Sequence, residues 1–234
     1  MCETISSALP RAIISRSALA AGAAAAVLAG GRTADLRRDA WGHGLLAVAQ
    51  AVTAAGADRV RVDAPGEVEA LRLEGITAVT EGEPDIAADL LYGLPDAGGM
   101  LATRPVMRLS GQVLSTKRLR RGDAVSYGYT YRAPSDTTVA LVTGGYAQGI
   151  VRALGNNADV EVGGVARPIV GRVAMDVCVV ELDGADVEVG ADVTFFGGRG
   201  PVAAGVAAWA EVTGMDAAEL ITVVGTHAVR GWEA

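Results

Sequence analysis

The stretch VMRLSGQVLSTKRLRRGDAVSYGYTYRAPSDTTVALVTGG, residues 106–145, decides the fold of the C-terminal part of the chain. Its Val, Thr and Tyr residues favour strands, and the segments RRGD and APSD favour turns between them. The same texture continues to residue 188 through the turn segments GNNAD and VGG. Short strands separated by turns predict a mostly antiparallel, barrel-like β-domain.

The residues before 94 follow a different pattern, in which β-branched runs alternate with stretches rich in Ala and Leu. This alternation is typical of βα units on a parallel sheet. It predicts strands at 12–15, 33–36, 59–62 and 76–80, and helices at 18–28, 45–54 and 65–73. Residues 202–212 predict a last helix, and a short apolar stretch, AAELITVVG, follows it.

The composition fits a protein with a sizeable buried core, since half of its 234 residues are hydrophobic. A net charge of -7 argues against binding to nucleic acid or to an anionic membrane, because both require clustered Lys and Arg. We therefore expect a small-molecule or protein partner. Cys2 and Cys178, like His43 and His227, lie far apart, so we expect no metal, no disulfide and a cytoplasmic location.

Residues 15–31, SRSALAAGAAAAVLAGG, allow two interpretations. The arginines near the start, the apolar middle and the small residues at the end are typical of a secretory signal. Ala and Leu are also strong helix formers, and the Gly30–Gly31 pair is an ordinary helix stop. We favour the helix, and the segment is too short to span a bilayer.

Three segments resemble, in order and spacing, the C-terminal domain of alanine racemases: GDAVSYGYTY (122–131), GGYAQGIVRAL (144–154) and PIVGRVAMDVCVVEL (168–182). Ordered motifs are more specific than any single one. Upstream, RRDAWGHG (37–44) is similar to the KADAYGHG segment of that family. The chain soon reaches LLYGLP (90–95), which the family places at the far end of its barrel, so most of the later βα units are missing.

The resemblance implies an α/β plus β fold in two domains. Residues 1–95 would form a partial, half-barrel-like parallel βα domain. Residues 96–234 would form an antiparallel, barrel-like β-domain of the alanine racemase type.

The resemblance also implies that the pyridoxal phosphate site is lost. The family's Schiff-base lysine is Arg37 here, and a guanidinium with a pKa above about 12 cannot become that nucleophile. Trp41 and Trp232 match tyrosines that help to hold the cofactor, and both lack the hydroxyl. Gln148 replaces an aspartate of the family motif. We therefore expect no cofactor.

Other parts of the family's site are retained by the motif match. Tyr127 matches the tyrosine that exchanges the α-proton of the substrate, and Tyr146 and Met175 match residues of the substrate pocket. Arg152 and Arg172 match polar residues near the entry channel. In the family these side chains reach across a dimer interface, so the resemblance implies a homodimer with a shared site. Trp41 and Trp232 complete the expected substrate-binding set.

Each of these residues also has a structural interpretation. Tyr127 and Tyr131 alternate along an expected strand and would then be ordinary sheet aromatics. His43 could have a loop role, and Trp41 and Trp232 could fill the space that the cofactor leaves. By composition alone Met175 is a core residue, and Cys178 is a buried, inert thiol.

Three functions remain open from the sequence. The first is a cofactor-independent enzyme that uses Tyr127 as acid and base, with Arg37, Asp39 and His43 as catalytic partners. A free tyrosine titrates near pH 10 and would need such a cationic neighbour. This enzyme would carry out proton transfer, isomerisation or cyclisation on a small carboxylate-bearing substrate. The second is a non-catalytic ligand-binding or scaffold pseudoenzyme, and the third is a residual amino-acid racemase. The sequence leans to the first.

Overall fold

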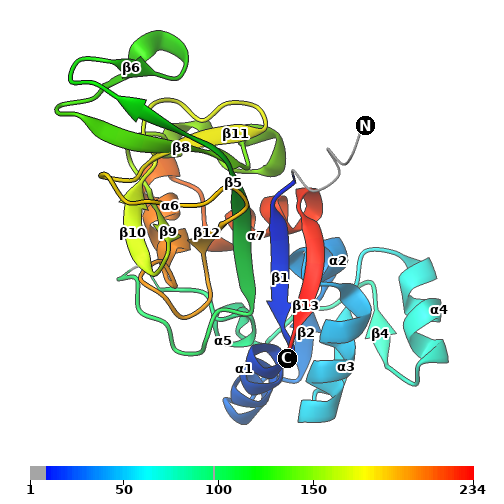
Figure 1. Ribbon diagram of the computed structural model, residues 1–234. Helices are drawn as coiled ribbons and strands as arrows, with labels where there is room; N and C mark the ends of the chain where they lie inside the picture. Colours follow the sequence, from blue (N-terminus) through cyan, green and yellow to red (C-terminus); the bar gives the residue numbers. More distant parts are fainter. Residues whose placement is uncertain (1–8, 97) are drawn as a thin grey trace.

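The computed structural model describes residues 9–96 and 98–234, and its largest element is an eight-stranded, mostly antiparallel sheet (Figure 1). One path through this sheet runs β10-β9-β12-β5-β1-β13, and β8 and β11 continue it from the far half of β5. The strands are β1 (Arg11–Ser15), β5 (Met107–Leu119), β8 (Thr137–Thr143), β9 (Asp159–Val162), β10 (Val165–Pro168), β11 (Val177–Glu181), β12 (Asp192–Phe196) and β13 (Val229–Glu233). The antiparallel β-domain expected from the sequence is therefore confirmed.

Strand β5 serves both halves of this sheet. Its first half pairs with β1 and β12, and its second half pairs with β8. The register shifts between Val113 and Ser115, which marks a bulge, and bulges bend a strand. The chain then turns into a small hairpin of β6 (Ala124–Val125) and β7 (Tyr131–Arg132).

The N-terminal part contains a three-stranded parallel sheet rather than the four strands expected. Its strands are β2 (Thr33–Asp35), β3 (Arg59–Arg61) and β4 (Ala78–Val79), with Ala34, Val60 and Ala78 in register. The expected strand 12–15 does form as β1, but it pairs with β5 and β13. Four of its five residues are buried, which suits a central strand of the large sheet.

Five helices accompany these strands: α1 (Arg16–Leu28), α2 (Arg37–Trp41), α3 (Leu45–Ala55), α4 (Pro65–Leu73) and α5 (Ala88–Tyr92). The ambiguous segment 15–31 forms helix α1, and the Ser15 hydroxyl caps it by accepting from the Ala18 amide. In residues 9–96 and 98–234, no helix has the length and apolar character needed to cross a bilayer.

The chain closes with α6 (Gly205–Thr213), α7 (Ala217–His227) and β13. The short apolar stretch that follows the expected last helix is α7, whose start is capped where the Glu219 carboxylate accepts from the Asp216 amide at 2.8 Å. Trp209 of α6 is fully buried and meets the rings of Phe195 and Phe196 edge-on. Cys178 is buried as expected, and burial raises the pKa of its thiol to about 12, whereas Cys2 lies outside the described residues.

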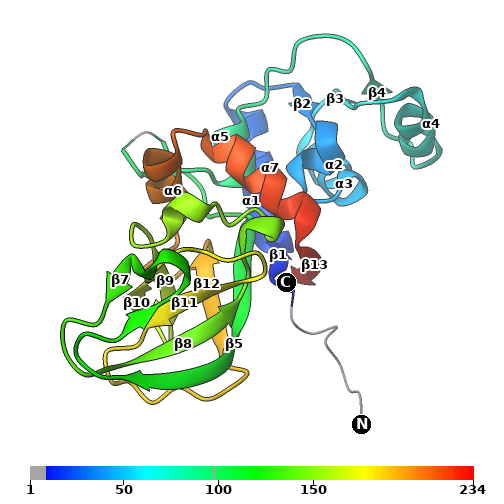
Figure 2. The same cartoon turned by 90° about the horizontal axis from the view of Figure 1, so that it is seen from above.

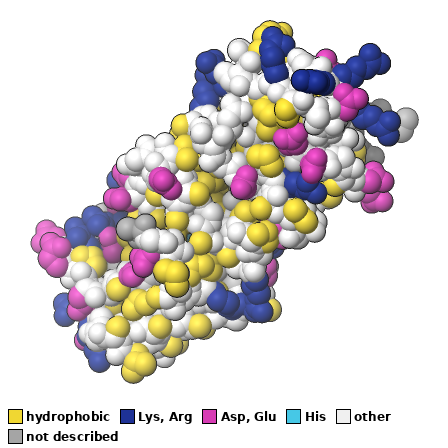
Figure 3. Space-filling view, turned by 90° about the vertical axis from the view of Figure 1, so that its left-hand side faces the viewer, with side chains coloured by type: hydrophobic (Ala, Val, Ile, Leu, Met, Phe, Trp, Pro, Cys, Tyr) yellow, Lys and Arg dark blue, Asp and Glu magenta, His cyan; other side chains and the backbone are white. Residues whose placement is uncertain are grey.

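The charge of the chain is unevenly distributed. Lys and Arg side chains gather at the upper end of the molecule, where β5 turns towards β6 (Figure 3). Exposed members of this group are Lys117, Arg118, Arg120, Arg121 and Arg132, and the Arg132 guanidinium donates to the Gly122 carbonyl across the turn at 3.0 Å. Although the net charge of the chain is -7, this end of the molecule is positively charged.

Helix α7 connects the two parts of the molecule through a contact between glycines. A Cβ added to Gly225 of α7 would lie 2.8 Å from the Cα of Gly42, the residue after α2. Gly42 itself has φ +77°, which side-chain-bearing residues rarely adopt. Only glycines at both positions allow the two backbones to approach this closely.

We expect Gly225→Ala to lower the free energy of unfolding by about 2–3 kcal/mol, because the added methyl would push α2 away from α7. Gly66→Ala is the matched control: Gly66 is also helical, has open space around its Cβ position and should change stability by less than about 1 kcal/mol. Urea denaturation of both variants measures the difference. Equal stability would mean that the glycine contact is not a constraint.

Candidate functional site

Helix α2, the segment that resembles the family's lysine-containing KADAYGHG segment, is a left-handed turn. Four consecutive residues, Arg38 to Trp41, have φ between 52° and 56°. For residues other than glycine this conformation costs roughly 1–2 kcal/mol each. The surrounding structure must therefore hold the turn in place.

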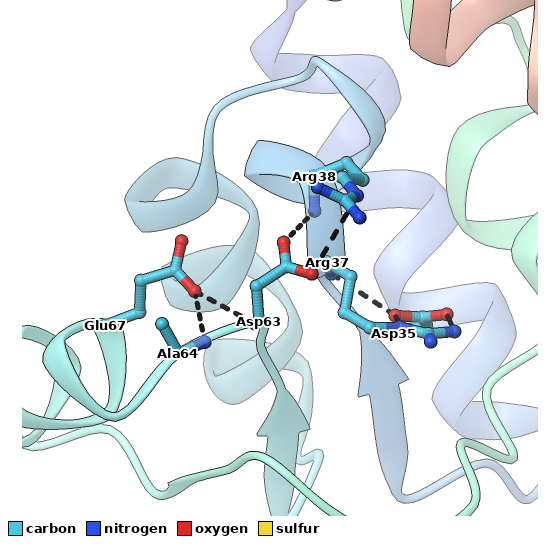
Figure 4. Close-up of polar contacts among 6 residues, drawn as sticks. All are labelled: Asp35, Arg37, Arg38, Asp63, Ala64 and Glu67. Atoms are coloured by element: carbon cyan, nitrogen blue, oxygen red, sulfur yellow. Dashed lines mark hydrogen bonds and ion pairs between the residues drawn. The ribbon is translucent and has the colours of Figure 1, made fainter.

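Carboxylates supply much of that support. Asp63 accepts a hydrogen bond from the Arg38 amide at 2.5 Å (Figure 4), and Asp39 accepts one from the Leu45 amide at 2.7 Å. The other oxygen of Asp39 forms an ion pair with Arg230 of β13. Asp39 is thus a structural anchor between α2, α3 and the large sheet.

Arg37, at the position of the family's lysine, forms a two-pronged ion pair with Asp35 (Figure 4). Its Nε and Nη2 donate to the two oxygens of Asp35 at 2.8 and 2.6 Å. Partial burial acts to raise the pKa of Asp35, but the hydrogen bonds from Arg37 outweigh it and hold that pKa below its usual value. The guanidinium is therefore engaged within its own chain.

His43 is completely buried and braces the same turn. Its Nδ1 lies 3.0 Å from the Ala40 carbonyl oxygen and 3.1 Å from that of Trp41. Because carbonyl oxygens only accept, Nδ1 carries the proton, and Nε2 is a lone pair without a partner in the described part of the chain. Burial lowers the pKa of His43 to about 4, so the ring is neutral near pH 7.

The two tryptophans lie in different surroundings. Trp41 stacks on Tyr92 at 5.1 Å between ring centroids, and Tyr92 in turn stacks on His43 at 4.4 Å. Trp232 lies under the guanidinium of Arg16 and borders Gly44. Trp41 therefore closes an aromatic stack next to the left-handed turn, and Trp232 forms part of a separate surface.

Tyr127 is not on a strand, as its alternation with Tyr131 had suggested, but in a short 3-10 turn, η2 (Tyr127–Tyr129). The turn requires glycine at position 128, because Gly128 has φ +78° and an added Cβ would lie 3.1 Å from Nη1 of Arg172. The Ser126 hydroxyl donates to the Arg172 carbonyl at 2.6 Å and fixes this approach. Tyr127 is consequently 72% exposed.

Tyr146 and Met175 come together on two adjoining turns. The Tyr146 amide donates to the Ala174 carbonyl, and the Ala147 amide donates to that of Met175, both at 2.9 Å. Tyr146 is 40% exposed and Met175 is 55% exposed, so Met175 is not a core residue. Both side chains are therefore available on the surface of the β-domain.

Gln148 holds these two turns together, a role that sequence reasoning missed. Its side-chain oxygen accepts from the Gly145 amide and its nitrogen donates to Asp176, each at 3.0 Å. The buried amide of Gln148 therefore ties the Tyr146 turn to the residue after Met175. The only signal in the sequence was its departure from the family's GYADG motif.

The arginines of the entry region lie close to the tyrosines. The Arg152 guanidinium lies over the Tyr146 ring, 4.9 Å from its centroid. Arg152 and Arg172 also line one shallow cleft of about 750 Å³. Arg152 thus lies against Tyr146, and Arg172 lies against the turn that contains Tyr127.

The two groups of site residues do not meet within one chain. Figures 1 and 2 both place the β6–β7 hairpin, which contains Tyr127, far from α2. Tyr127 is also exposed rather than enclosed in a cavity with Tyr146. A site that combines Tyr127 with Arg37, Asp39 and His43 would need a second chain.

The residues present do not fit pyridoxal phosphate. Arg37 cannot form an aldimine and is held by Asp35, and the chain has a single lysine, Lys117. Lys117 lies on β5, paired with Val139 in the β-domain, and not at the end of β2. Within residues 9–96 and 98–234, no group of three metal-binding side chains comes together either.

A short parallel βα sheet joined to an antiparallel β-domain, with exposed tyrosines on the β-domain, defines a protein of the α/β plus β class. The chain belongs to the alanine racemase family, because the family model "Alanine racemase, C-terminal domain" matches residues 106–232.

Curated relatives agree with this assignment. The chain is 40% identical over 157 residues to the alanine racemase of Mycolicibacterium vanbaalenii, a match covering 62% of this chain and 38% of that protein. It is 39% identical over 149 residues to that of Streptomyces coelicolor, covering 63% and 35%. The chain spans less than two fifths of the length of these relatives.

Solved structures show the same fold. The alanine racemase from Streptomyces coelicolor A3(2) superposes with a TM-score of 0.78 at 23% identity, covering 96% of this chain and 98% of that one. The enzyme from D-cycloserine producing Streptomyces lavendulae gives 0.82 at 19% identity, covering 99% and 98%. At these identities the likeness establishes the fold alone.

We expect stability to fall between about pH 7 and pH 5 because of His43. Its pKa is about 4 in the folded chain and about 6.5 when unfolded, so its contribution is full above pH 6.5 and is lost as the pH falls towards 4. Urea denaturation should show a loss of about 2 kcal/mol over this interval. His43→Gln should remove most of the slope, whereas His227→Gln should keep it. An unchanged slope in His43→Gln would contradict the assignment.

Proposed function

We propose that this chain is a non-catalytic, ligand-binding member of the alanine racemase family that works as a homodimer and without pyridoxal phosphate. The ion pair between Arg37 and Asp35 carries the proposal. A guanidinium whose Nε and Nη2 are both bound to one carboxylate offers no amine for the cofactor, and its charge is already paired.

The other expected catalytic residues of the turn support the same proposal. Asp39 is bound to the Leu45 amide and to Arg230, and His43 is buried, neutral and hydrogen-bonded to carbonyls. A general base must reach the proton that it removes. Asp39 is taken up by an amide and by Arg230, and His43 is fully buried, so we assign both residues the role of holding the turn.

The β-domain presents exposed side chains of the types that are common in binding surfaces. Tyr127, Tyr146 and Met175 are exposed, and exposed Tyr, Met and Arg side chains are typical of interface residues. We therefore assign binding of a small carboxylate-bearing ligand, or of a second chain, to this face.

Homodimer formation follows from surfaces that one chain leaves open. Three parallel strands cannot close a barrel that needs eight, and in the described part of the chain β4 pairs with β3 alone. Open sheet edges and exposed aromatic side chains favour coverage by another chain. A shared site would bring Tyr127 of one chain close to the left-handed turn of its partner.

Catalysis is the second candidate function. The 40% identity to an alanine racemase and the accessible Tyr127 hydroxyl favour it. A cofactor-independent isomerase or cyclase would lose turnover in Tyr127→Phe while folding normally. A residual racemase would in addition depend on pyridoxal phosphate.

Adding pyridoxal phosphate should produce neither an aldimine absorbance band nor a higher unfolding temperature, because a ligand stabilises a protein only as far as it binds the native state. Arg37→Lys should produce neither the aldimine band nor the higher unfolding temperature, since Asp35 would keep the new amine protonated. Lys117→Arg is the control, because a band that disappears in it comes from incidental labelling of the one native lysine. Racemisation of alanine by the native chain would overturn the non-catalytic assignment, and racemisation by Arg37→Lys alone would show that the remaining residues still fit the cofactor.

Light scattering should give the mass of a dimer at micromolar concentration, with an interface above about 2,000 Å². Met175→Asp should shift the dimer towards monomer because it places a charge on the proposed interface. Val189→Asp alters another exposed apolar residue, in the turn before β12, and should leave the mass unchanged. A monomer that persists at micromolar concentration would contradict the shared site.

A further inference from the structure

We propose that one end of the β-domain binds single-stranded nucleic acid. This surface, hereafter the basic end, is formed by Lys117, Arg118, Arg120, Arg121 and Arg132, which are all exposed and lie on the end of β5, the turn after it and β7. Figure 3 shows Lys and Arg side chains gathered at that end. The inference goes beyond the proposed function and uses none of the residues on which that proposal rests.

The net negative charge of the chain lies elsewhere. Residues 57–96 contain ten acidic and three basic side chains, whereas residues 117–132 contain five basic side chains and one acidic one, Asp123. Figures 1 and 2 place α4 and β4, which belong to the acidic segment, far from the β6–β7 hairpin. Salt screens exposed charges more than about 10 Å apart, so a polyanion responds to the local cluster and not to the net charge.

The positive charges of the basic end are not neutralised within the described chain. The ion pairs in residues 9–96 and 98–234 all involve other arginines. Asp123 accepts a hydrogen bond from the Arg120 amide at 2.9 Å, and Asp136 accepts one from the Arg121 amide at 2.8 Å. These two carboxylates therefore order the backbone of the turn and leave its guanidiniums free for phosphate groups.

An exposed aromatic ring adjoins these charges. Tyr129 is 66% exposed, and the guanidinium of Arg132 lies 6.0 Å from its ring centroid. The same guanidinium donates to the Gly122 carbonyl at 3.0 Å, so Arg132 links Tyr129 to the turn that holds Arg120 and Arg121. Proteins that bind single strands combine cations for the phosphates with aromatic rings on which unpaired bases stack.

Other polyanions fit the basic end less well. Stable attachment to an anionic membrane needs apolar side chains that insert between the lipids in addition to basic ones. Leu119 and Val125, the aliphatic residues on either side of the turn, are only 2% and 8% exposed. In a duplex the bases are already stacked on one another, so Tyr129 would find no free base. The observations therefore favour an unpaired strand.

Fluorescence anisotropy of a labelled oligouridine of about 12 nucleotides, titrated with the full chain, tests the proposal. We expect a Kd in the micromolar range at about 50 mM salt and an affinity about fifty-fold lower at about 200 mM salt, which corresponds to about four phosphate contacts. Arg120→Gln should weaken binding about five-fold and make the slope of log Kd against log salt shallower by about 0.7. Arg199→Gln removes an exposed arginine outside the basic end and should change neither quantity.

Tyr129→Leu separates stacking from charge. It should weaken binding about ten-fold and leave the salt dependence unchanged, because it removes a stacking surface and no charge. Thermal unfolding of each variant checks that it folds.

Four results would overturn the inference. They are no binding with up to about 100 µM chain at about 50 mM salt, an equal loss in Arg199→Gln, native affinity in Tyr129→Leu, or binding to phosphatidylserine vesicles with none to the oligouridine. Native affinity in Tyr129→Leu would mean that the surface recognises charge alone. Binding to the vesicles only would identify a membrane as the partner.

Discussion

The approach of Gly42 to Gly225 is the contact on which the rest of the structure depends. It places the left-handed turn against α7 with no side chain between them. On its neighbouring positions α7 meets Gly149, where Val223 and Val224 approach the end of the Tyr146 turn. One helix therefore sets the position of both groups of candidate site residues, although they remain far apart in space. A shift of α7 would change both together.

The left-handed turn explains why the residues expected to be catalytic have other tasks. A strained backbone persists only where its surroundings fix it. Here Asp39, Asp63 and His43 provide the fixation through amides and carbonyls of the turn and its neighbours. A side chain that is needed to hold the backbone is not free to exchange protons with a ligand. These two tasks compete, and in this turn the side-chain contacts serve the backbone.

Much of the fold could be predicted from the sequence, because local periodicity reports local structure. The expected helix 65–73 forms with those bounds, 45–54 extends by one residue, and the β-domain lies where the turn signals placed it. Periodicity does not show which strands pair. Residues 12–15 were therefore expected in the parallel sheet, whereas β1 lies in the large sheet, and β13 was not expected at all. The site was harder to predict. The exposure of Tyr127 depends on the positive φ of Gly128, and the burial of His43 depends on contacts with Tyr92, which is distant in the chain.

The position of β1 has a consequence for how the protein folds. This strand lies between β5 and β13, and Arg11 pairs with Val229, which is far from it in the sequence. Contacts between segments so distant in a chain form slowly, because a long loop must be closed before they are made. The helices can form from local contacts, whereas β1 is completed as a central strand only when β13 has joined it. Until then its apolar edge is open to association with other chains.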